Sequence, residues 1–353
     1  MVLSERKLKI KIIGAKKMDR RYLISPEGNF YKAQLHTHST VSDGSLTPEE
    51  VKEAYKKHGY SVVAFTDHSR LVQHNDLTDD SFLAINAYEF EVNHGMLGGS
   101  ERCYHLNFYA KTPEIYRQVF FDPKMASWCY SKEELAEFNY VGEPVQSEYS
   151  VEFINKAIKA ANENGFMVCY NHPAWSMQLE EDFVGLEGLF AFEIYNHGSE
   201  IMEANGYAPH NYTSMLRAGK LPACIASDDS HSKRTRDENS PYYDINGGYV
   251  MVKAKELSYG AIIDALERRD FYASTGVEIE ELYIEDNRVH IKTSPCRQIT
   301  LIGDRRCNRV ARSAACDLTE ATLDISPKCG SFWILCEDDR GHFAATSAAE
   351  ARV

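Results

Sequence analysis

The sequence predicts an α/β fold, with a barrel as the leading architecture, followed by a small all-β part. Three observations predict it. Short apolar segments recur between residues 33 and 253, and segments with helical punctuation separate several of them. After residue 276 the pattern changes to short strand-like segments with little helix. Only two of the 13 histidines, His290 and His342, fall in that last part, so the histidine-rich chemistry belongs to the α/β part.

The apolar segments are five to eight residues long and rich in Val, Ile, Phe and Tyr, which is typical of strands. The expected strands are 33–37, 61–66, 84–91, 103–109, 166–171, 190–195, 222–227 and 248–253. Because these segments are short and almost wholly apolar, we expect parallel strands that are buried on both faces.

Helix boundaries can be read between these strands. In residues 45–59, Thr47 is the expected cap, Pro48 the first helical residue, Glu50 the third, and Gly59 the end. Residues 147–165 and 256–270 have similar punctuation. Strands that alternate with helices favour a parallel sheet, and seven or eight such strands favour a closed, TIM-like barrel.

Three further segments complete the predicted organisation. Residues 1–30 are expected to form a strand pair packed on the barrel, which itself spans 31–276. Residues 111–150 are long for a connection and rich in aromatic residues, so they predict a lid or a packing insertion. Residues 277–353 predict a small β-sandwich.

Composition limits the classes of function. The net charge of −13 argues against broad binding of nucleic acid but not against a small phosphorylated ligand held by metal ions. No apolar run approaches the length that crosses a bilayer, and the N-terminus does not resemble a signal peptide. The nine cysteines are scattered in apolar contexts, which predicts reduced thiols and a cytoplasmic location.

Metal-type side chains follow or end many of the apolar segments. They are His36, His38, Asp43, Asp67, His68, Glu89, His105, His172, Asp229 and His231. Polar residues at the ends of apolar segments are costly unless they converge on a common partner. In an α/β barrel, the C-terminal ends of the strands meet at one mouth, so we expect these side chains to gather there.

Two or three divalent ions would explain this pattern. His36 and His38 alternate along one extended segment, so both imidazoles project to the same side and can hold one ion. A mixture of imidazoles and carboxylates suits zinc, manganese or iron. Neighbouring ions polarise a phosphoryl oxygen and activate a water molecule, so the pattern predicts hydrolysis of a phosphoester.

Several segments together resemble the polymerase-and-histidinol-phosphatase (PHP) superfamily of metal-dependent phosphoesterases. They are "HTHSTVSDGSLTPEE", "GYSVVAFTDHS", "AYEFE", "YHLNFYA", "NHP" and "ASDDSH", and "RRDFYASTG" with the "EDDRGHFAATS" tail resembles a bacterial subgroup that has a C-terminal β-domain. The resemblance implies a distorted seven-stranded α/β barrel with up to three metal ions. This chain departs from the family just before the bridging Glu, because it has Ala87-Tyr88 where family members often have Gly. The departure leaves the choice of substrate open.

Carried over residue by residue, the resemblance implies three ion sites. The first would be held by His36, His38, Glu89 and Asp229, the second by Asp43, His68 and His231, and the third by His105 and His172 with Glu89 as a bridge. The Asp-x-His spacing of the family selects Asp229 over Asp228, which stays open as a supporting partner. Glu91 is the alternative to Glu89, since both lie on the same face of one strand.

Three residues are candidates for catalysis beside the ions: Asp67, Glu193 and Arg70. Asp67 and Glu193 could transfer protons or orient ligands, and Asp67 could instead cap the end of a strand. Arg70, Lys233, Arg234 and Arg236 could bind phosphate, with a solvated charge run as the alternative. His197 could line the pocket.

The sequence thus predicts a metal-dependent hydrolase of a small phosphomonoester, phosphodiester or nucleotide. Two alternatives remain open, which are hydrolysis of a carboxyl ester or amide in the same metal cup, and a non-catalytic metal-binding module. The expected partner is a small phosphorylated substrate, without a membrane or stable nucleic-acid binding. The substrate, the native metals and the oligomeric state are not predicted.

Overall fold

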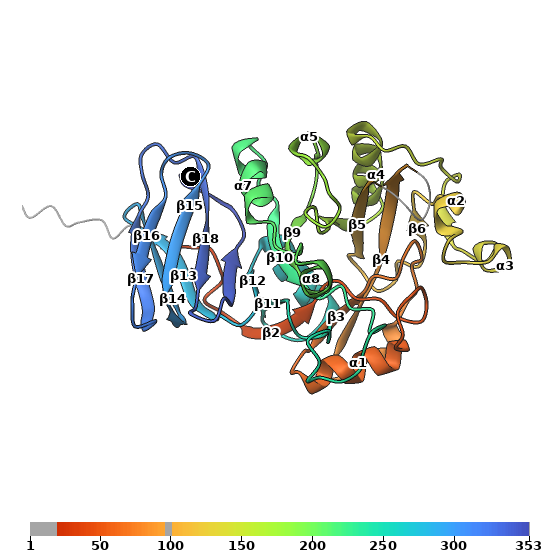
Figure 1. Ribbon diagram of the computed structural model, residues 1–353, viewed down its shortest axis with the longest axis horizontal. Coiled ribbons are helices and arrows are strands. Elements are labelled where there is room, and N and C mark those ends of the chain that lie inside the picture. The colour runs from red at the N-terminus through yellow and green to blue at the C-terminus, as the bar shows by residue number, and fades with distance from the viewer. Residues whose placement is uncertain (1–19, 96–100, 353) are drawn as a thin grey trace, which may run out of the picture.

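The structure is a computed structural model that describes residues 20–95 and 101–352 (Figure 1). The helices are α1 Pro48–Lys57, α2 Pro123–Ala126, α3 Lys132–Leu135, α4 Val151–Glu163, α5 Glu180–Phe183, α6 His197–Glu203, α7 Pro209–Arg217 and α8 Tyr259–Arg268, with a short 3₁₀ helix at Asn75–Leu77. The strands up to residue 276 are β1 Arg21–Tyr22, β2 Asn29–Gln34, β3 Val62–Phe65, β4 Leu83–His94, β5 Arg102–Ala110, β6 Gln118–Val119, β7 Tyr140–Val141, β8 Phe166–Tyr170, β9 Ala191–Asn196, β10 Ala223–Ser227, β11 Tyr249–Ala254 and β12 Phe271–Ser274. The later strands are β13 Ile279–Glu285, β14 Arg288–Cys296, β15 Gln298–Gly303, β16 Arg309–Arg312, β17 Leu318–Asp324, β18 Ser331–Glu337, β19 Phe343–Thr346 and β20 Ala349–Glu350.

One large mixed sheet runs through the molecule. Its strand order is β10-β9-β8-β5-β4-β3-β2-β11-β12-β19-β18-β15-β16, and β20 pairs with β18. The pairs β2–β3, β3–β4, β8–β9 and β9–β10 are parallel, as the sequence predicts. The pairs β4–β5, β5–β8 and β11–β2 are antiparallel, so the prediction of an all-parallel sheet is wrong.

The reversed direction of β5 has a local cause. β4 ends at His94 and β5 begins at Arg102, so too few residues lie between them for the helical crossover that parallel neighbours need, and the two strands pair as a hairpin. Ladder pairing places Glu91 opposite His105 and Glu89 opposite Asn107. The hairpin therefore brings two of the predicted metal-type residues into adjacent strands.

The end of β10, at one edge of this sheet, approaches the end of β2 near the histidines. Thr37, after β2, forms an isolated parallel bridge with Ser230, after β10. The backbone N–H of His38 donates to the carbonyl of Ser230 at 2.9 Å, and that of Asp229 donates to the carbonyl of His36 at 2.9 Å. β2 and β10 themselves form no ladder, so the predicted closed seven-stranded barrel is not confirmed, although the fold is mixed α/β as predicted.

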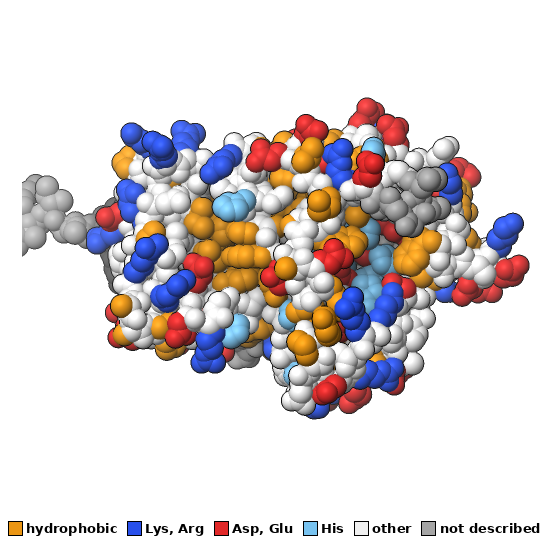
Figure 2. Space-filling view, in the orientation of Figure 1, with side chains coloured by type: hydrophobic (Ala, Val, Ile, Leu, Met, Phe, Trp, Pro, Cys, Tyr) orange, Lys and Arg blue, Asp and Glu red, His pale blue; other side chains and the backbone are white. Residues whose placement is uncertain are grey.

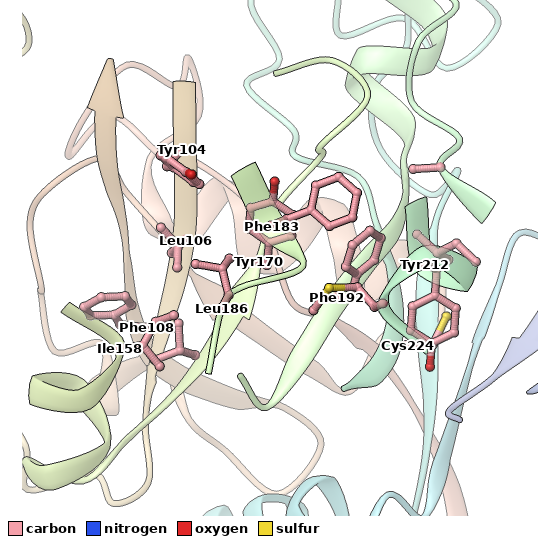
Figure 3. Packing of buried hydrophobic residues seen from close by; sticks show 14 of the residues in the cluster. Tyr104, Leu106, Phe108, Ile158, Tyr170, Phe183, Leu186, Phe192, Tyr212 and Cys224 are labelled. Carbon is pink, nitrogen blue, oxygen red and sulfur yellow. The ribbon is translucent and has the colours of Figure 1, made fainter. Parts of the chain in front are cut away.

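The predicted helices form where their caps indicate. Thr47 and Glu50 make a reciprocal capping box at the start of α1, which ends at Lys57. α4 begins after the cap residue Ser150, and α8 begins after Ser258. Side chains of α4 join a large apolar cluster with β5, β8 and β9, in which Leu106, Phe108, Ile158, Tyr170 and Phe192 pack together (Figure 3). This core fixes the strands that carry the polar residues.

The C-terminal part contains a separate antiparallel sheet of order β1-β13-β14-β17. The strands β15, β16, β18 and β19 instead continue the large sheet, because β19 pairs with β12. Apolar side chains from both sheets, among them Leu282, Val289, Ile299 and Ile334, form one buried cluster. The predicted sandwich is therefore partly an extension of the main sheet, at the left in Figure 1.

The predictions for residues 1–30 and 111–150 can also be compared with the structure. Residues 1–19 of the expected N-terminal strand pair lie outside the described residues, and in the described part β1 pairs with β13 of the C-terminal sheet. Residues 111–150 carry α2, α3 and the small β6–β7 pair, with their own apolar cluster of Phe121, Ala126, Tyr130 and Phe138. Within residues 20–95 and 101–352, the helices are too short or too polar to span a bilayer.

Candidate metal centre

The nine predicted metal ligands lie together. Their ligand atoms form four overlapping groups, each with spacings of at most 4.8 Å. The groups are His38–Asp43–His68–His231, His36–His38–Asp229, His36–Glu89–His172 and His68–Glu89–His105. Figure 2 shows histidine side chains gathered in a hollow of the surface, on the side of the molecule where β4, β5 and α2 lie. Residues that are up to 195 positions apart therefore meet in one site.

Glu89 occupies the middle of this site and is 1% exposed. Five imidazoles lie within 3.5 Å of its carboxylate. Oε1 is 3.3 Å from Nε2 of His36, 3.1 Å from Nδ1 of His105 and 3.3 Å from Nε2 of His172. Oε2 is 3.5 Å from Nε2 of His38 and 3.3 Å from Nδ1 of His68. A carboxylate whose two oxygens face different imidazoles can bridge two ions.

A second convergence involves His36, His38 and Asp229. Oδ1 of Asp229 lies 3.2 Å from Nε2 of His36 and 3.0 Å from Nε2 of His38. The two Nε2 atoms are 3.3 Å apart. Ligands around one zinc-like ion, each about 2.1 Å from it, are separated by about this distance. A shared ion explains this spacing better than hydrogen bonds among the three side chains do.

The groups differ in part from the three sets that the resemblance implies. His38 joins Asp43, His68 and His231 as well as the first set. His105 and His172 do not share one group, because each lies in a different group with Glu89. Glu89 therefore connects more of the site than a single bridge between two ions would.

A tight loop presents Asp43. Gly44 is required there, because a Cβ at this position would lie 2.7 Å from the backbone of His38. Asp67 holds the start of the same loop, since its carboxylate accepts hydrogen bonds from the N–H and hydroxyl groups of Ser39 and Ser42 at 2.8–3.1 Å. Asp67 is 1% exposed, so the structure favours the structural alternative for this residue over a role in proton transfer.

Glu193 lies behind the site. Its Oε1 is 3.0 Å from Nδ1 of His36, and its Oε2 accepts the backbone N–H of His172 at 2.9 Å. It is fully buried. A carboxylate on the remote nitrogen of an imidazole fixes the tautomer that leaves the other nitrogen free for a metal. The geometry thus favours the orienting role of Glu193 over the catalytic one.

The backbone is strained at two of the predicted ligands. His172 has a φ of 24° and Asp229 a φ of 52°, a region that residues with a Cβ rarely adopt. Asp228, next to Asp229, is buried and points elsewhere. Its carboxylate accepts the backbone N–H groups of residues 246–248 at 2.7–2.8 Å. Asp228 therefore anchors the segment before β11, and only Asp229 enters the site, as the family spacing implies.

The carboxylates of the site are held in their charged forms. Burial alone would lower the pKa of His36, but the carboxylates of Asp229 and Glu89 raise it well above its usual value. Burial alone would raise the pKa of Glu89, but neighbouring imidazoles, His105 first among them, lower it well below its usual value. The pKa of Asp229 is lowered in the same way against the effect of burial, chiefly by His36. Carboxylates that keep their negative charge in this way are suited to bind cations.

The pKa values of His231 and His68 shift in opposite directions. Burial would lower the pKa of His231, but Asp43 and Asp229 raise it to about 9. Burial and the neighbouring His38 lower the pKa of His68 to about 3. His68 is thus neutral and ready to be a ligand at physiological pH, whereas an ion that binds His231 must displace its proton.

Unpartnered polar atoms support the fit of a metal. Among the described residues, Nδ1 of His38, Nδ1 of His68 and Oδ1 of Asp229 are buried without a hydrogen-bond partner. Buried polar atoms without partners are rare in folded proteins. All three atoms have lone pairs that a divalent ion can accept, and the donor set of imidazoles and carboxylates suits zinc, manganese or iron. The residues present fit the ions that the sequence predicts.

The metal-type residues form the floor of a cavity of about 390 Å³. Its lining comprises Asp43, His68, Glu89, Glu91, Asn93, Cys103, His105, Trp128, His172, Trp175, Asp229 and His231. Sequence reasoning weighed Glu91 only as a rival of Glu89 and included Trp128 only among the aromatic residues of the 111–150 lid or packing insertion, and it missed Asn93, Cys103 and Trp175. Burial raises the pKa of Glu91 to about 7. The alternation of Glu89 and Glu91 on one strand is the signal that could have placed both in the site.

The predicted phosphate-binding cations lie outside the cavity or at its edge. The guanidinium of Arg70 lies over the rings of Tyr130 and Phe138, 5.6 and 5.0 Å from their centres. Arg70 thus packs against the 111–150 insertion and does not line the cavity, so this arrangement does not support its predicted catalytic role. Lys233 contacts the Asp43 carboxylate at the rim. His197 faces Tyr195 and the carbonyl of Tyr243 rather than the cavity.

Comparison with solved structures finds distant similarity. A two-domain protein from Bacteroides vulgatus, containing a predicted PHP-like metal-dependent phosphoesterase, is 17% identical with a TM-score of 0.44, over 95% of this chain and all of that one. A proposed metal-dependent phosphoesterase from Bifidobacterium adolescentis is 14% identical with a TM-score of 0.37, over 60% of this chain and 91% of that one. An amidohydrolase from Chromobacterium violaceum, solved with bound sulfate and no metal, is 18% identical with a TM-score of 0.37, over 56% and 87%.

Comparison with curated proteins finds no significant match. The PHP domain model, in contrast, matches residues 34–214, slightly more than half of the chain. The matched segment includes seven of the nine predicted ligands, and Asp229 and His231 follow it. The assignment rests on this match, and the chain belongs to the PHP domain family.

Proposed function

We propose that this protein is a metal-dependent hydrolase that cleaves a small phosphoester. The observation that carries the proposal is the position of Glu89, whose buried carboxylate has five imidazoles within 3.5 Å at the floor of a cavity. A site that only stabilises the fold is normally closed around one ion by four ligands. Nine candidate ligands beside a cavity favour a catalytic centre of two or three ions in a barrel-like PHP fold.

The residues of this chain would divide between holding the ions and orienting the ligands. His36, His38, Glu89 and Asp229 would hold one ion, and Asp43, His68 and His231 another, with His105 and His172 available for a third through Glu89. When bound, such ions supply Lewis-acid activation of a phosphoryl oxygen and of the attacking water. Glu193 would orient His36, and Asp67 would keep the Asp43 loop in place.

Attack would be followed by departure of the alcohol. A bond forms between the water oxygen and phosphorus, the bond from phosphorus to the alcohol oxygen breaks, and the alcohol leaves with a proton. Glu91 is the one carboxylate of the lining outside the predicted ligand set, and its raised pKa of about 7 suits exchange of a proton near neutrality. The products are an alcohol and phosphate, or a phosphomonoester if the substrate is a diester.

The proposal is tested by stripping the protein with a chelator and reloading it with zinc, manganese or iron. Phosphate release from phosphomonoesters, and nitrophenol release from bis(4-nitrophenyl) phosphate, are then measured beside carboxyl esters and amides. Metal-dependent cleavage of a phosphoester is the expected result. Cleavage of carboxyl esters or amides alone would show that the protein hydrolyses those bonds instead of phosphoesters. A folded, metal-loaded protein that cleaves nothing would favour the non-catalytic module.

A further inference from the structure

Two tryptophans stand at the walls of the cavity. The chain has three tryptophans, and Trp333 is fully buried in the core, whereas Trp128 and Trp175 line the cavity. Trp128 follows α2 in the 111–150 insertion, and its ring centre lies 5.0 Å from that of His68. Trp175 follows β8, 5.0 Å from the ring of His172 and 5.9 Å from that of His105. Two separate segments thus each place an indole beside the histidines that line the cavity.

Both indoles are tethered through their polar edges. Nε1 of Trp128 donates to Oε1 of Glu91 at 2.5 Å, and Nε1 of Trp175 donates to Oε1 of Glu203 at 3.3 Å. With the N–H groups already partnered, the rings can offer only apolar and π contacts to a ligand. Trp128 is nevertheless 45% exposed. Figure 2 shows hydrophobic side chains bordering the hollow that holds the histidines.

The charge of the lining restricts the ligand further. The cavity is lined by four carboxylates, those of Asp43, Glu89, Glu91 and Asp229. Within the described part of the chain, no lysine or arginine lines it. A phosphoryl group would therefore be neutralised by the ions, and a second phosphate inside the cavity would lie among carboxylates, because Lys233 at the rim already pairs with Asp43. The volume of about 390 Å³ lies near the lower end of the usual range for small-molecule sites.

We propose that the substrate carries one phosphoryl group on an uncharged alcohol with an aromatic ring, and that this ring packs on Trp128 and Trp175. Aryl and arylalkyl phosphates are the substrate class that these contacts fit. The inference rests on the proposed phosphoester hydrolysis and adds the identity of the leaving group. Aromatic pairs prefer offset or edge-to-face packing, and each contributes about 2- to 10-fold in affinity beyond burial of the ring.

The experiment compares esters whose leaving alcohols have similar reactivity. Metal-loaded protein is assayed with 2-phenylethyl phosphate, 2-cyclohexylethyl phosphate and glucose 6-phosphate. We expect kcat/KM for the phenylethyl ester to exceed that for glucose 6-phosphate at least about 10-fold, with the cyclohexyl ester between them. Equal values for the three esters, or a preference for the sugar phosphate, would overturn the inference while leaving phosphoester hydrolysis intact.

Variants assign the preference to the indoles. In Trp128→Ala and in Trp175→Ala, the ratio of kcat/KM for the phenylethyl ester to that for glucose 6-phosphate should fall about 5- to 10-fold, mainly through KM. Trp→Phe at either position should restore most of the ratio. Tyr116→Ala is the matched control, since Tyr116 is an aromatic of the same insertion, 55% exposed, that does not line the cavity. An unchanged ratio in both alanine variants would refute the assignment.

A binding measurement separates this inference from the proposed function. Because Trp333 is buried, a change in tryptophan fluorescence reports chiefly on Trp128 and Trp175. The metal-loaded protein is titrated with 2-phenylethylphosphonate, which cannot be hydrolysed, and with methylphosphonate. A fluorescence change with at least about 10-fold tighter binding of the phenylethyl compound supports the aromatic contact even if no ester is cleaved. Equal binding of both compounds counts against it.

Discussion

Nδ1 of His36 lies 3.0 Å from Oε1 of Glu193, and both side chains are fully buried. The contact commits the Nδ1 position of the imidazole to the carboxylate, so that Nε2 faces Asp229 and Glu89 and offers its lone pair once an ion displaces the proton there. One carboxylate on β9 thereby determines how the first histidine of the site presents itself. The negative charge of Glu193 also increases the basicity of the ring.

Replacing Glu193 by Gln should weaken metal binding about 10- to 100-fold, because the remote charge on His36 is lost while the shape is kept. Competition with a chelating dye measures the affinity, and circular dichroism checks the fold. Glu187→Gln is the control, since Glu187 is a largely exposed carboxylate that pairs with Lys220. If Glu193→Gln bound metal as tightly as the control, the orienting role would be wrong.

Replacing His36 or Asp229 by Ala should abolish turnover and reduce the bound metal. Each side chain contacts two or more of the other candidate ligands, so its loss opens the shared site. Elemental analysis of the purified variants gives the metal content, and phosphate release gives the activity. His290→Ala and His342→Ala, both in the C-terminal part, should keep metal and activity. Wild-type activity in both site variants would reject the assigned centre.

Metal binding should release protons and strengthen with pH. In the metal-free protein the carboxylates raise the pKa of His231 to about 9, above the ordinary value of 6.5, so the imidazole is charged at pH 7. Its charged form stabilises the metal-free fold below pH 6.5, and this stabilisation is lost as pH rises through 9. An ion must displace that proton, so affinity should rise by up to about 10-fold per pH unit between pH 6.5 and 9.

Calorimetric titration of the metal-free protein with zinc, in buffers of different ionisation enthalpy, counts the protons released. His231→Gln should reduce that number and flatten the dependence on pH. An affinity that stayed constant between pH 6.5 and 9 would contradict the charged state of His231 in the metal-free site.

Replacing Asp67 by Asn should destabilise the loop that carries Asp43. The carboxylate accepts four hydrogen bonds from Ser39 and Ser42, and loss of such buried contacts costs about 1–3 kcal/mol. Thermal unfolding should show the lower stability, and the metal content should fall with it. A variant with full metal content and normal stability but no turnover would instead assign Asp67 to proton transfer.

Replacing Arg70 by Ala should change stability more than catalysis. The guanidinium packs on Tyr130 and Phe138, contacts worth about 0.5–1 kcal/mol, and it does not line the cavity of the metal centre. We expect kcat/KM within about threefold of wild type and a slightly lower melting temperature. A loss of two orders of magnitude in kcat/KM, with the fold intact, would restore Arg70 as a phosphate-binding residue.

Much of the fold follows from local signals. The capping box of Thr47 and Glu50 places α1, and the eight apolar segments place the main strands within a few residues. The direction of β5 was not readable, because apolar runs do not record whether a hairpin or a crossover joins two strands. The continuation of the large sheet into the C-terminal strands was not readable either, since the β12–β19 pairing joins residues about 70 positions apart.

The sequence by itself determined which side chains are available for metal chemistry, because imidazoles and carboxylates at the ends of apolar segments are visible in one dimension. Only the tertiary structure decided what each of them does. Asp67, Glu193 and Arg70 differ from the ligands in what they face, namely a loop, the back of His36 and two aromatic rings. The position of Trp175 beside the histidines was equally hidden, because proximity between distant segments arises from packing and has no local signature.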